Sequence, residues 1–261
     1  MTTPASRQFR DAYAAHRAAE GRGAGGEAEL LALPYLVEGP LARAWRVRAR
    51  SYDALVRWLP PSSRRILDLG AGNGWLCYRL TRLGHRPTAV DVRTDTVDGL
   101  AAGAPYANHV PTMFDRVAAT FATLPFADRS AHLAIFNAAL HYADDLACAL
   151  REAARVVRAG GHLVILDSPC YEDAADGEAM LREKRAKGAA RFGADAPVLL
   201  APAYVEFLTP ARLAAASEPH GLVWRRHRVR YPLWYELRPW IARWRGRRAP
   251  SRFDLWTAEV P

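Results

Sequence analysis

The sequence predicts an α/β fold, in which a Rossmann-like, mostly parallel sheet carries helices on both faces. Three observations support this prediction. In "RRILDLGAGNGWLCYRL", residues 64–80, a glycine-rich turn joins an apolar run to a second run at helical spacing. From residue 66 to residue 166, short apolar runs alternate with segments of helical periodicity. Half of the 261 residues are hydrophobic, which is enough for one sizeable core.

The first part of the chain supplies a helix before the sheet and then three strands. Residues 41–58 place apolar side chains at helical spacing with arginines between them, and Pro60-Pro61 ends this helix. Gly84 stops the helix that follows the glycine-rich turn. The elements expected here are a helix over 41–58, a strand over 66–69, a helix over 75–83, a strand over 88–92, a helix starting near Asp95 and a strand over about 117–121.

The second part of the chain completes the sheet and adds further helices. Gly160-Gly161 is expected to close a helix, and Thr209-Pro210 begins another as an N-cap followed by proline at the first helical position. The elements expected here are strands over 133–136 and 162–166, a helix over 145–157, a charged helix over 177–190, the helix that begins at Thr209, and strands near 222–230 and 252–259.

We expect one domain over residues 27–261, preceded by a polar and weakly ordered segment over residues 1–26. The helix over 41–59 and an insertion over 168–208 are expected to form a helical cap. The last part, residues 222–261, is expected to form a terminal hairpin that carries the final antiparallel strand.

Composition excludes several classes of protein. No run of 18 or more apolar residues is present, so no membrane span is expected. The first ten residues lack the pattern of a signal peptide. The three cysteines, Cys77, Cys148 and Cys170, are scattered and make neither a zinc pattern nor a disulfide framework. We therefore expect no metal site and a reducing, cytoplasmic location.

The glycine-rich turn poses the question of its ligand. The dinucleotide fingerprint needs a third glycine where this chain has the bulky Trp75, after Gly70 and Gly72. Asp91 lies 21 residues after Gly70, at the end of the next expected strand, where its carboxylate can accept from both hydroxyls of a ribose. That geometry suits NAD and S-adenosylmethionine (SAM) alike, and a tight turn without a ligand is a further interpretation.

A family resemblance favours SAM. The segments "ILDLGAGNGW", "AVDVR", "ATLPFAD", "IFNAALHY" and "EAARVVRAGGHLVILDSP" occur in the order and spacing of class I SAM-dependent methyltransferases. The sequence most resembles the small-molecule branch that includes quinone C-methyltransferases, over about residues 60–168. The resemblance implies a seven-stranded sheet with an antiparallel last strand, SAM as cofactor and a small molecule as methyl acceptor.

The resemblance also implies roles for individual residues. The glycine turn would let the backbone approach the amino-acid part of SAM, Asp68 would hold its ammonium group, and Asp91 would bind its ribose. Two positions depart from the family pattern: Thr120 stands where an acid usually accepts from the adenine amino group, and His132 stands where Asp is common. The implied SAM-binding residues are Asp68, Gly70, Ala71, Gly72, Asn73, Asp91, Val92, Thr120, Phe121 and Asn137.

Candidates for catalysis follow the fourth and fifth expected strands. A general base is needed only if the acceptor must lose a proton, and His141 is favoured because an imidazole titrates near neutral pH. Tyr142 is the second candidate, and Asp167 and Tyr171 lie at the next strand end. A structural role for His141 is the alternative. The sequence leaves the acceptor atom and the oligomeric state open.

Residues 224–248, "WRRHRVRYPLWYELRPWIARWRGRR", concentrate tryptophan and arginine. This segment could form an apolar wall for the acceptor, lie on an anionic membrane surface or bind RNA. Alternatively, its indoles fill the core while its arginines cover the outside. After the fourth strand the chain reads Asn137-Ala138-Ala139-Leu140, which is not the motif of amino-directed nucleic-acid methyltransferases. We therefore expect no nucleic-acid partner. The alternatives are an RNA or membrane-surface methyltransferase and a non-catalytic SAM-binding protein.

Overall fold

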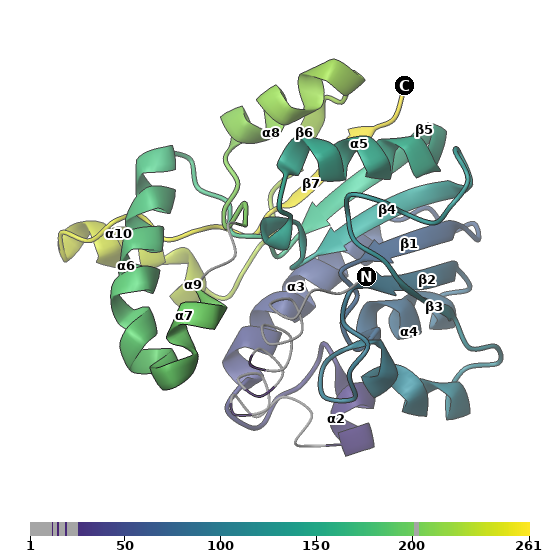
Figure 1. Cartoon of the computed structure of the whole chain (residues 1–261), viewed down its shortest axis with the longest axis horizontal. Coiled ribbons are helices and arrows are strands. Elements are labelled where there is room, and N and C mark those ends of the chain that lie inside the picture. Colours follow the sequence, from purple (N-terminus) through teal and green to yellow (C-terminus); the bar gives the residue numbers. More distant parts are fainter. Residues whose placement is uncertain (1–11, 13–14, 16–18, 20–25, 201–203) are drawn as a thin grey trace.

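The computed structural model describes residues 26–200 and 204–261, together with residues 12, 15 and 19. Its centre is a seven-stranded sheet in the order β3-β2-β1-β4-β5-β7-β6 (Figure 1). The strands are β1 (Arg65–Leu69), β2 (Arg86–Asp91), β3 (Asp115–Ala118), β4 (Ala131–Asn137), β5 (Val157–Leu166), β6 (Trp224–His227) and β7 (Leu255–Glu259). Strands β1 to β5 run parallel, and β7 is antiparallel to both of its neighbours. This confirms the predicted fold class.

Helices cover both faces of the sheet (Figure 1). The α-helices are α2 (Gly26–Ala32), α3 (Ala42–Trp58), α4 (Trp75–Arg82), α5 (Leu146–Val156), α6 (Ala174–Phe192), α7 (Ala196–Leu199), α8 (Pro210–Ser217), α9 (Leu233–Glu236) and α10 (Arg238–Trp244). Short 3-10 helices are η1 (Leu100–Asn108), η2 (Leu140–Tyr142), η3 (Gly193–Asp195) and η4 (Glu218–His220). Within the described ranges, no helix is long and apolar enough to cross a bilayer.

Strand periodicity divides the core into two layers. Along β1, Ile66 packs with the cluster that contains α3 and α4, whereas Leu67 and Leu69 pack with the cluster that contains α5 and α8. Successive side chains of a strand point to opposite faces, so a strand buried on both sides reads as a continuous apolar run. This burial explains why the central strands could be predicted from their apolar runs.

Two predicted boundaries were wrong. No α-helix starts near Asp95. Its carboxylate instead accepts from the backbone N–H groups of Val97 and Asp98, and the chain continues into η1. The pair Gly160-Gly161 does not close a helix either. Helix α5 ends at Val156 and β5 begins at the next residue, so both glycines lie inside the strand. A register shift between β4 and β5 accommodates them.

Other predicted elements are confirmed, with small shifts at their ends. Thr209 caps α8, because its side-chain oxygen accepts from the N–H of Arg212. The charged helix is α6, and the terminal strands are β6 and β7. The predicted strand over 117–121 is β3, which ends at Ala118. The predicted weakly ordered segment over 1–26 lies outside the described residues, apart from Gly26 and the three isolated positions.

Candidate functional site

The candidate site lies along the carboxyl ends of the parallel strands. In the register of the sheet, Asp68 of β1 stands beside Ala89 of β2 on one side and Ile135 of β4 on the other. Asp91 and Asn137 are the last residues of β2 and β4, and Asp167 directly follows β5. Four polar residues from neighbouring strands therefore share one edge, which is where ligands bind in open α/β sheets.

The glycine turn between β1 and α4 is held close to this edge. The N–H groups of Gly70 and Ala71 both donate to the carbonyl oxygen of Val90, at 2.8 and 3.0 Å. Gly70 has φ +82°, and a Cβ there would lie 2.4 Å from the Cβ of Ala139 and 3.2 Å from the ring of Phe121. The turn therefore needs glycine for both its conformation and its space. Among the predicted SAM-binding residues, this brings Gly70, Ala71 and Phe121 together.

The Asp91 carboxylate receives two backbone hydrogen bonds. Oδ2 accepts from the N–H of Gly72 and Oδ1 accepts from the N–H of Arg93, each at 2.8 Å. Burial raises the pKa of Asp91, although both bonds favour the ionised form. Each carboxylate oxygen keeps a further lone pair, which fits two ribose hydroxyls as donors. Val92 follows with 47% of its surface exposed, so it is open to contact with a base.

Asp68 has a different environment. It is almost completely buried; Oδ2 accepts a weak bond from the Cys77 thiol at 3.6 Å, and Oδ1 has no hydrogen-bond partner among the described residues. Burial raises the pKa of Asp68 to about 7. A buried carboxyl oxygen without a partner is costly unless a donor or a cation reaches it. Asp68 therefore fits a cationic ligand group such as the ammonium group of SAM.

The ends of β4 and β5 carry two more unpartnered oxygens. Oδ1 of Asn137 and Oδ2 of Asp167 are buried and have no hydrogen-bond partner in the part of the chain that the structure describes. The chain after each strand adopts a left-handed conformation at a residue other than glycine, with φ +53° at both Ala138 and Asp167. Such conformations collect at functional sites, where the surrounding structure enforces them. The predicted contact of Asn137 with the amino-acid part of SAM, through its backbone carbonyl, stays a prediction.

Two predicted cofactor residues are arranged less favourably. The Asn73 side chain is committed to the fold: its Oδ1 accepts from the N–H of Trp75 at the start of α4, and its Nδ2 lies 3.4 Å from Asp98. Thr120 is exposed and forms an isolated bridge with Thr123 beyond the end of β3. Its role toward adenine stays a prediction.

The predicted catalytic pair lies in η2, next to the end of β4. His141 Nδ1 lies 3.3 Å from the Ser168 hydroxyl, and its ring lies 4.2 Å from that of Tyr142. Burial, together with the positive charges of Arg48 and Lys184, lowers the pKa of His141 to about 3. The imidazole is therefore neutral throughout the physiological range. The expectation that it titrates near neutral pH was wrong, because a free histidine does not experience this desolvation.

A hydrogen-bonded chain that no sequence pattern predicted runs from α3 to the terminal hairpin. The Ser51 hydroxyl lies 2.5 Å from Asp167 Oδ1 and 2.8 Å from the Tyr231 hydroxyl, which also donates to the carbonyl oxygen of Phe253. Burial raises the pKa of Asp167. Ser51 donates to Asp167 Oδ1, and the Tyr231 hydroxyl connects Ser51 to the carbonyl oxygen of Phe253. Nothing in the sequence pairs Ser51 with Tyr231, which lies 180 residues further along the chain.

The comparison with known families decides the class of the domain. Residues 67–165 match the family described as a methyltransferase domain. This range contains the glycine turn and three of the four strand-end polar residues; Asp167 lies two residues beyond it. These residues form a class I SAM-dependent methyltransferase domain. The predicted cofactor, SAM, is the one this family uses.

Relatives of this methyltransferase domain have related names. Over 111 residues, 42% of each chain, it is 37% identical to an uncharacterized methyltransferase of Mycobacterium tuberculosis. Over 136 residues, 51% of each chain, it is 31% identical to the ubiquinone/menaquinone biosynthesis C-methyltransferase of Dinoroseobacter shibae. The alignments thus span about half the length of these curated relatives.

Solved structures share the fold of the methyltransferase domain. The geranyl diphosphate C-methyltransferase of Streptomyces coelicolor, determined with S-adenosyl-L-homocysteine, superposes with a TM-score of 0.62 at 16% identity. That match covers 83% of this chain and 77% of the other. The YcgJ protein of Bacillus subtilis gives a TM-score of 0.59 at 17% identity, covering 82% and 99%. At these identities the likeness concerns the fold alone.

Two glycines of equal backbone conformation test the close approach at the turn. Gly70 and Gly84 both have φ +82°, but nothing lies within 4 Å of a Cβ at Gly84. Gly84→Ala should cost only the strain of a left-handed residue, about 1–2 kcal/mol. Gly70→Ala should cost clearly more and should also weaken SAM binding by about tenfold or more, because the turn must move away from Ala139. Urea unfolding measures the loss of stability, and calorimetric titration measures the loss of SAM affinity. Equal losses in the two variants would contradict the close approach of the turn to Ala139.

Asp68→Asn should separate the charge of Asp68 from its packing. Because the pKa in the folded protein, about 7, exceeds that of the unfolded chain, this group's contribution to stability is full near pH 4 and is lost as pH rises toward 7. Each pKa unit corresponds to about 1.4 kcal/mol, so the variant should gain about 4 kcal/mol at about pH 8 relative to about pH 4, equivalent to a Tm higher by roughly 10 °C. Its SAM affinity should nevertheless fall.

The exposed carboxylate of Asp115, in β3, provides the matched control, Asp115→Asn. Melting curves at several pH values and SAM titrations of both variants make the comparison. If Asp68→Asn and the wild type keep parallel stability profiles, Asp68 is not the buried acid described here.

Proposed function

We propose that the protein transfers the methyl group of SAM to a small-molecule acceptor. The observation that supports this most strongly is the contrast between the two carboxylates beside the glycine turn. Asp68 is buried with an unpartnered oxygen, and Asp91 is held by two backbone N–H groups with lone pairs to spare. One suits a cation and the other suits hydroxyl donors, and SAM carries both: the ammonium group of its amino acid and the hydroxyls of its ribose.

The residues of this chain would divide the work of binding SAM. Asp68 and Asn137 would hold its amino-acid part, which the Gly70 turn can approach closely, and Asp91 would accept from the ribose. Val92, Phe121 and Thr120 would border the adenine. When bound, SAM supplies an electrophilic methyl group on a sulfonium centre. The protein then has to align an acceptor with that group and exclude water.

We propose that the acceptor lies beside polar groups from three parts of the chain. Arg48 and Ser51 lie on α3, His141 and Tyr142 on η2, and Asp167 after β5. The charge of Arg48 acts on both His141 and Asp167 and lowers the pKa of each. We propose that the neutral His141 and its neighbour Tyr142 border the acceptor and orient it. With a pKa near 3, His141 would accept a proton only from an acidic group.

The class of acceptor is inferred from the relatives and the strand-end motif. Relatives are named as methyltransferases in quinone biosynthesis, and the chain after β4 lacks the tetrad of amino-directed nucleic-acid enzymes. We therefore propose a small, largely apolar acceptor of the quinone or lipid kind. The scattered thiols, of which Cys77 and Cys170 are buried and free, accord with a cytoplasmic location.

Titration calorimetry with SAM, its demethylated product and NAD tests the cofactor directly. The protein should bind the first two and not NAD. Asp91→Ala should weaken SAM binding by about 1–3 kcal/mol, or 5- to 150-fold, because the ribose hydroxyls lose their acceptor. Asp115→Ala, which removes an exposed carboxylate from the neighbouring strand, should leave affinity unchanged. An unchanged affinity in Asp91→Ala would mean that the ribose lies elsewhere.

Transfer of a labelled methyl group tests the acceptor class and His141. With labelled SAM, radioactivity should enter demethylmenaquinone or a related apolar molecule and should not enter RNA. His141→Ala should keep SAM affinity and lower turnover by about tenfold or more. Between about pH 6 and 7, the pH profile of the wild type should contain no step that depends on His141, since this imidazole is already neutral there. Loss of such a step on His141→Ala would contradict the lowered pKa.

A further inference from the structure

The positive charge of the chain is concentrated in one segment. Residues 224–248 contain nine arginines and one acid, Glu236, while the formal net charge of the entire chain is +9. The other residues are therefore almost neutral in sum. Three of the nine arginines are used inside the fold: Arg226 and Arg248 form ion pairs, and Arg238 donates to backbone carbonyls. The other six are exposed: Arg225, Arg228, Arg230, Arg243, Arg245 and Arg247.

The same segment exposes a stripe of large apolar side chains. Helices α9 and α10 are continuous, since Leu237 donates to Leu233, Ile241 to Leu237 and Arg245 to Ile241 through backbone hydrogen bonds. The apolar positions recur at helical spacing and fall within an arc of about 100° on the helix. The stripe consists of Leu233, Leu237, Trp240, Ile241 and Trp244, which are 44% to 84% exposed.

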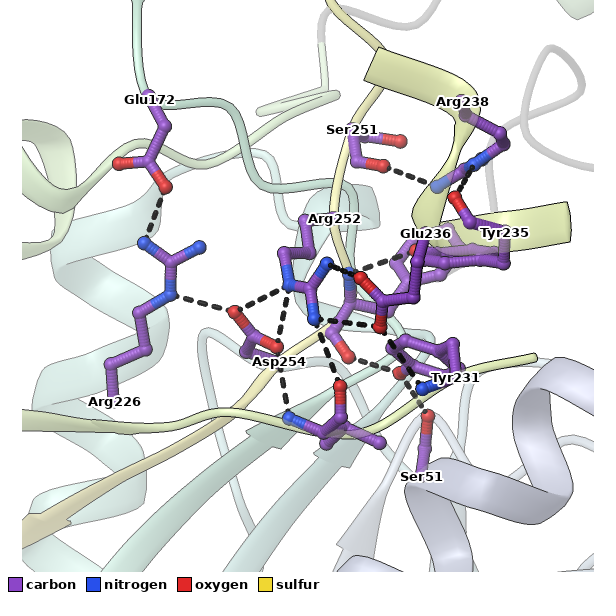
Figure 2. A network of polar contacts seen from close by, with 12 residues as sticks. Ser51, Glu172, Arg226, Tyr231, Tyr235, Glu236, Arg238, Ser251, Arg252 and Asp254 are labelled. Atoms are coloured by element: carbon purple, nitrogen blue, oxygen red, sulfur yellow. Dashed lines mark hydrogen bonds and ion pairs between the residues drawn. The ribbon is translucent and has the colours of Figure 1, made fainter. Parts of the chain in front are cut away.

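The opposite side of this helical segment is anchored firmly in the protein. Tyr235 is buried, and its hydroxyl accepts from the N–H of Phe253 at 3.2 Å. Arg252 binds Glu236 of α9 and Asp254, which also receives Arg226 (Figure 2). The apolar stripe is therefore displayed by a fixed element of the fold. In Figure 1, α10 reaches the edge of the molecule on the side away from the sheet.

Further contacts tie the segment to the two cap helices. Arg43 of α3 lies over the ring of Trp234 at 4.2 Å, which leaves that indole half-buried. Beyond α10, Arg248 pairs with Glu183 of α6, and the N–H of Ala249 donates to Asp176 of the same helix. The aromatic side chains of the segment therefore fall into two groups. Trp234 and Tyr235 pack inward, whereas Trp240 and Trp244 face solvent.

We propose that the α9–α10 face docks on the surface of an anionic lipid bilayer. Tryptophan and long aliphatic side chains suit the boundary between headgroups and acyl chains, and arginines at the border of the stripe suit anionic headgroups. Leu233, Leu237 and Ile241 offer nothing to stacked nucleobases, which argues against RNA. Two copies meeting through this face would bring their exposed arginines together, which argues against self-association.

Hydrogen bonds connect the docking face to the residues that we propose to lie beside the acceptor. The backbone N–H of Tyr231, two residues before α9, donates to Glu236 Oε1 at 3.1 Å. Its hydroxyl lies 2.8 Å from Ser51, which contacts Asp167. Docking itself requires no assumption about which molecule is methylated.

Co-sedimentation of the full chain with vesicles tests the proposal. Vesicles of phosphatidylcholine containing about one-third phosphatidylglycerol should retain the protein, and pure phosphatidylcholine should retain much less. Trp240→Ser with Trp244→Ser should weaken binding by about tenfold or more. Arg243→Gln with Arg245→Gln should weaken binding as well. Binding of the wild-type protein should fall as the salt concentration rises to about 0.5 M. Quenching of tryptophan fluorescence by brominated acyl chains should disappear with the two indoles.

Matched double variants serve as controls. Leu83→Ser with Val223→Ser removes exposed apolar side chains elsewhere, and Arg57→Gln with Arg86→Gln removes exposed arginines elsewhere; neither should change vesicle binding. Circular dichroism and SAM titration verify that each variant folds. Three results would overturn the proposal: no preference for anionic vesicles, equal binding by the tryptophan variant, or a requirement for Trp240 and Trp244 only in RNA binding or in dimer formation measured by light scattering.

Discussion

The hydrogen bonds that fasten the glycine turn to β2 are the constraint on which the rest of the site depends. Gly70 and Ala71 donate to the carbonyl oxygen of Val90, and Gly72 donates to the carboxylate of Asp91. Three successive N–H groups are thereby held toward the end of the neighbouring strand. This fixes the start of α4, brings the turn against Ala139, and positions the Asp91 carboxylate before any ligand arrives. Preorganisation of this kind reduces the ordering cost of binding.

Burial then gives chemically identical side chains different tasks. Asp68, Asp91 and Asp167 all lie at strand ends, yet each has a different set of donors. Asp91 has two backbone N–H groups, Asp167 has one hydroxyl, and Asp68 has only a thiol. Since desolvation raises the pKa of all three, the donors and nearby charges decide which of them is most readily ionised. The same effect keeps His141 neutral.

The terminal hairpin links the sheet to the surface of the molecule. Its last strand, β7, lies antiparallel between β5 and β6, and Asp254 just before that strand binds Arg226 and Arg252. Through Arg252 and Glu236 this network holds α9 in place, and through Tyr231 it reaches Ser51 on α3. An exposed apolar stripe is costly unless something covers it, and here the polar network keeps the stripe in one orientation.

Local patterns in the sequence determined the sheet, the glycine turn and most helices, because periodicity and glycine or proline signals act over a few residues. They also predicted that Asp91 lies at the end of the strand that follows the glycine turn. Tertiary structure decided the rest. It placed Gly160-Gly161 inside β5 through a register shift with β4, and it joined Ser51 to Tyr231 across 180 residues. It also buried Tyr235 while exposing Trp240. Burial and long-range partners set these outcomes, and neither is encoded in the local pattern of a segment.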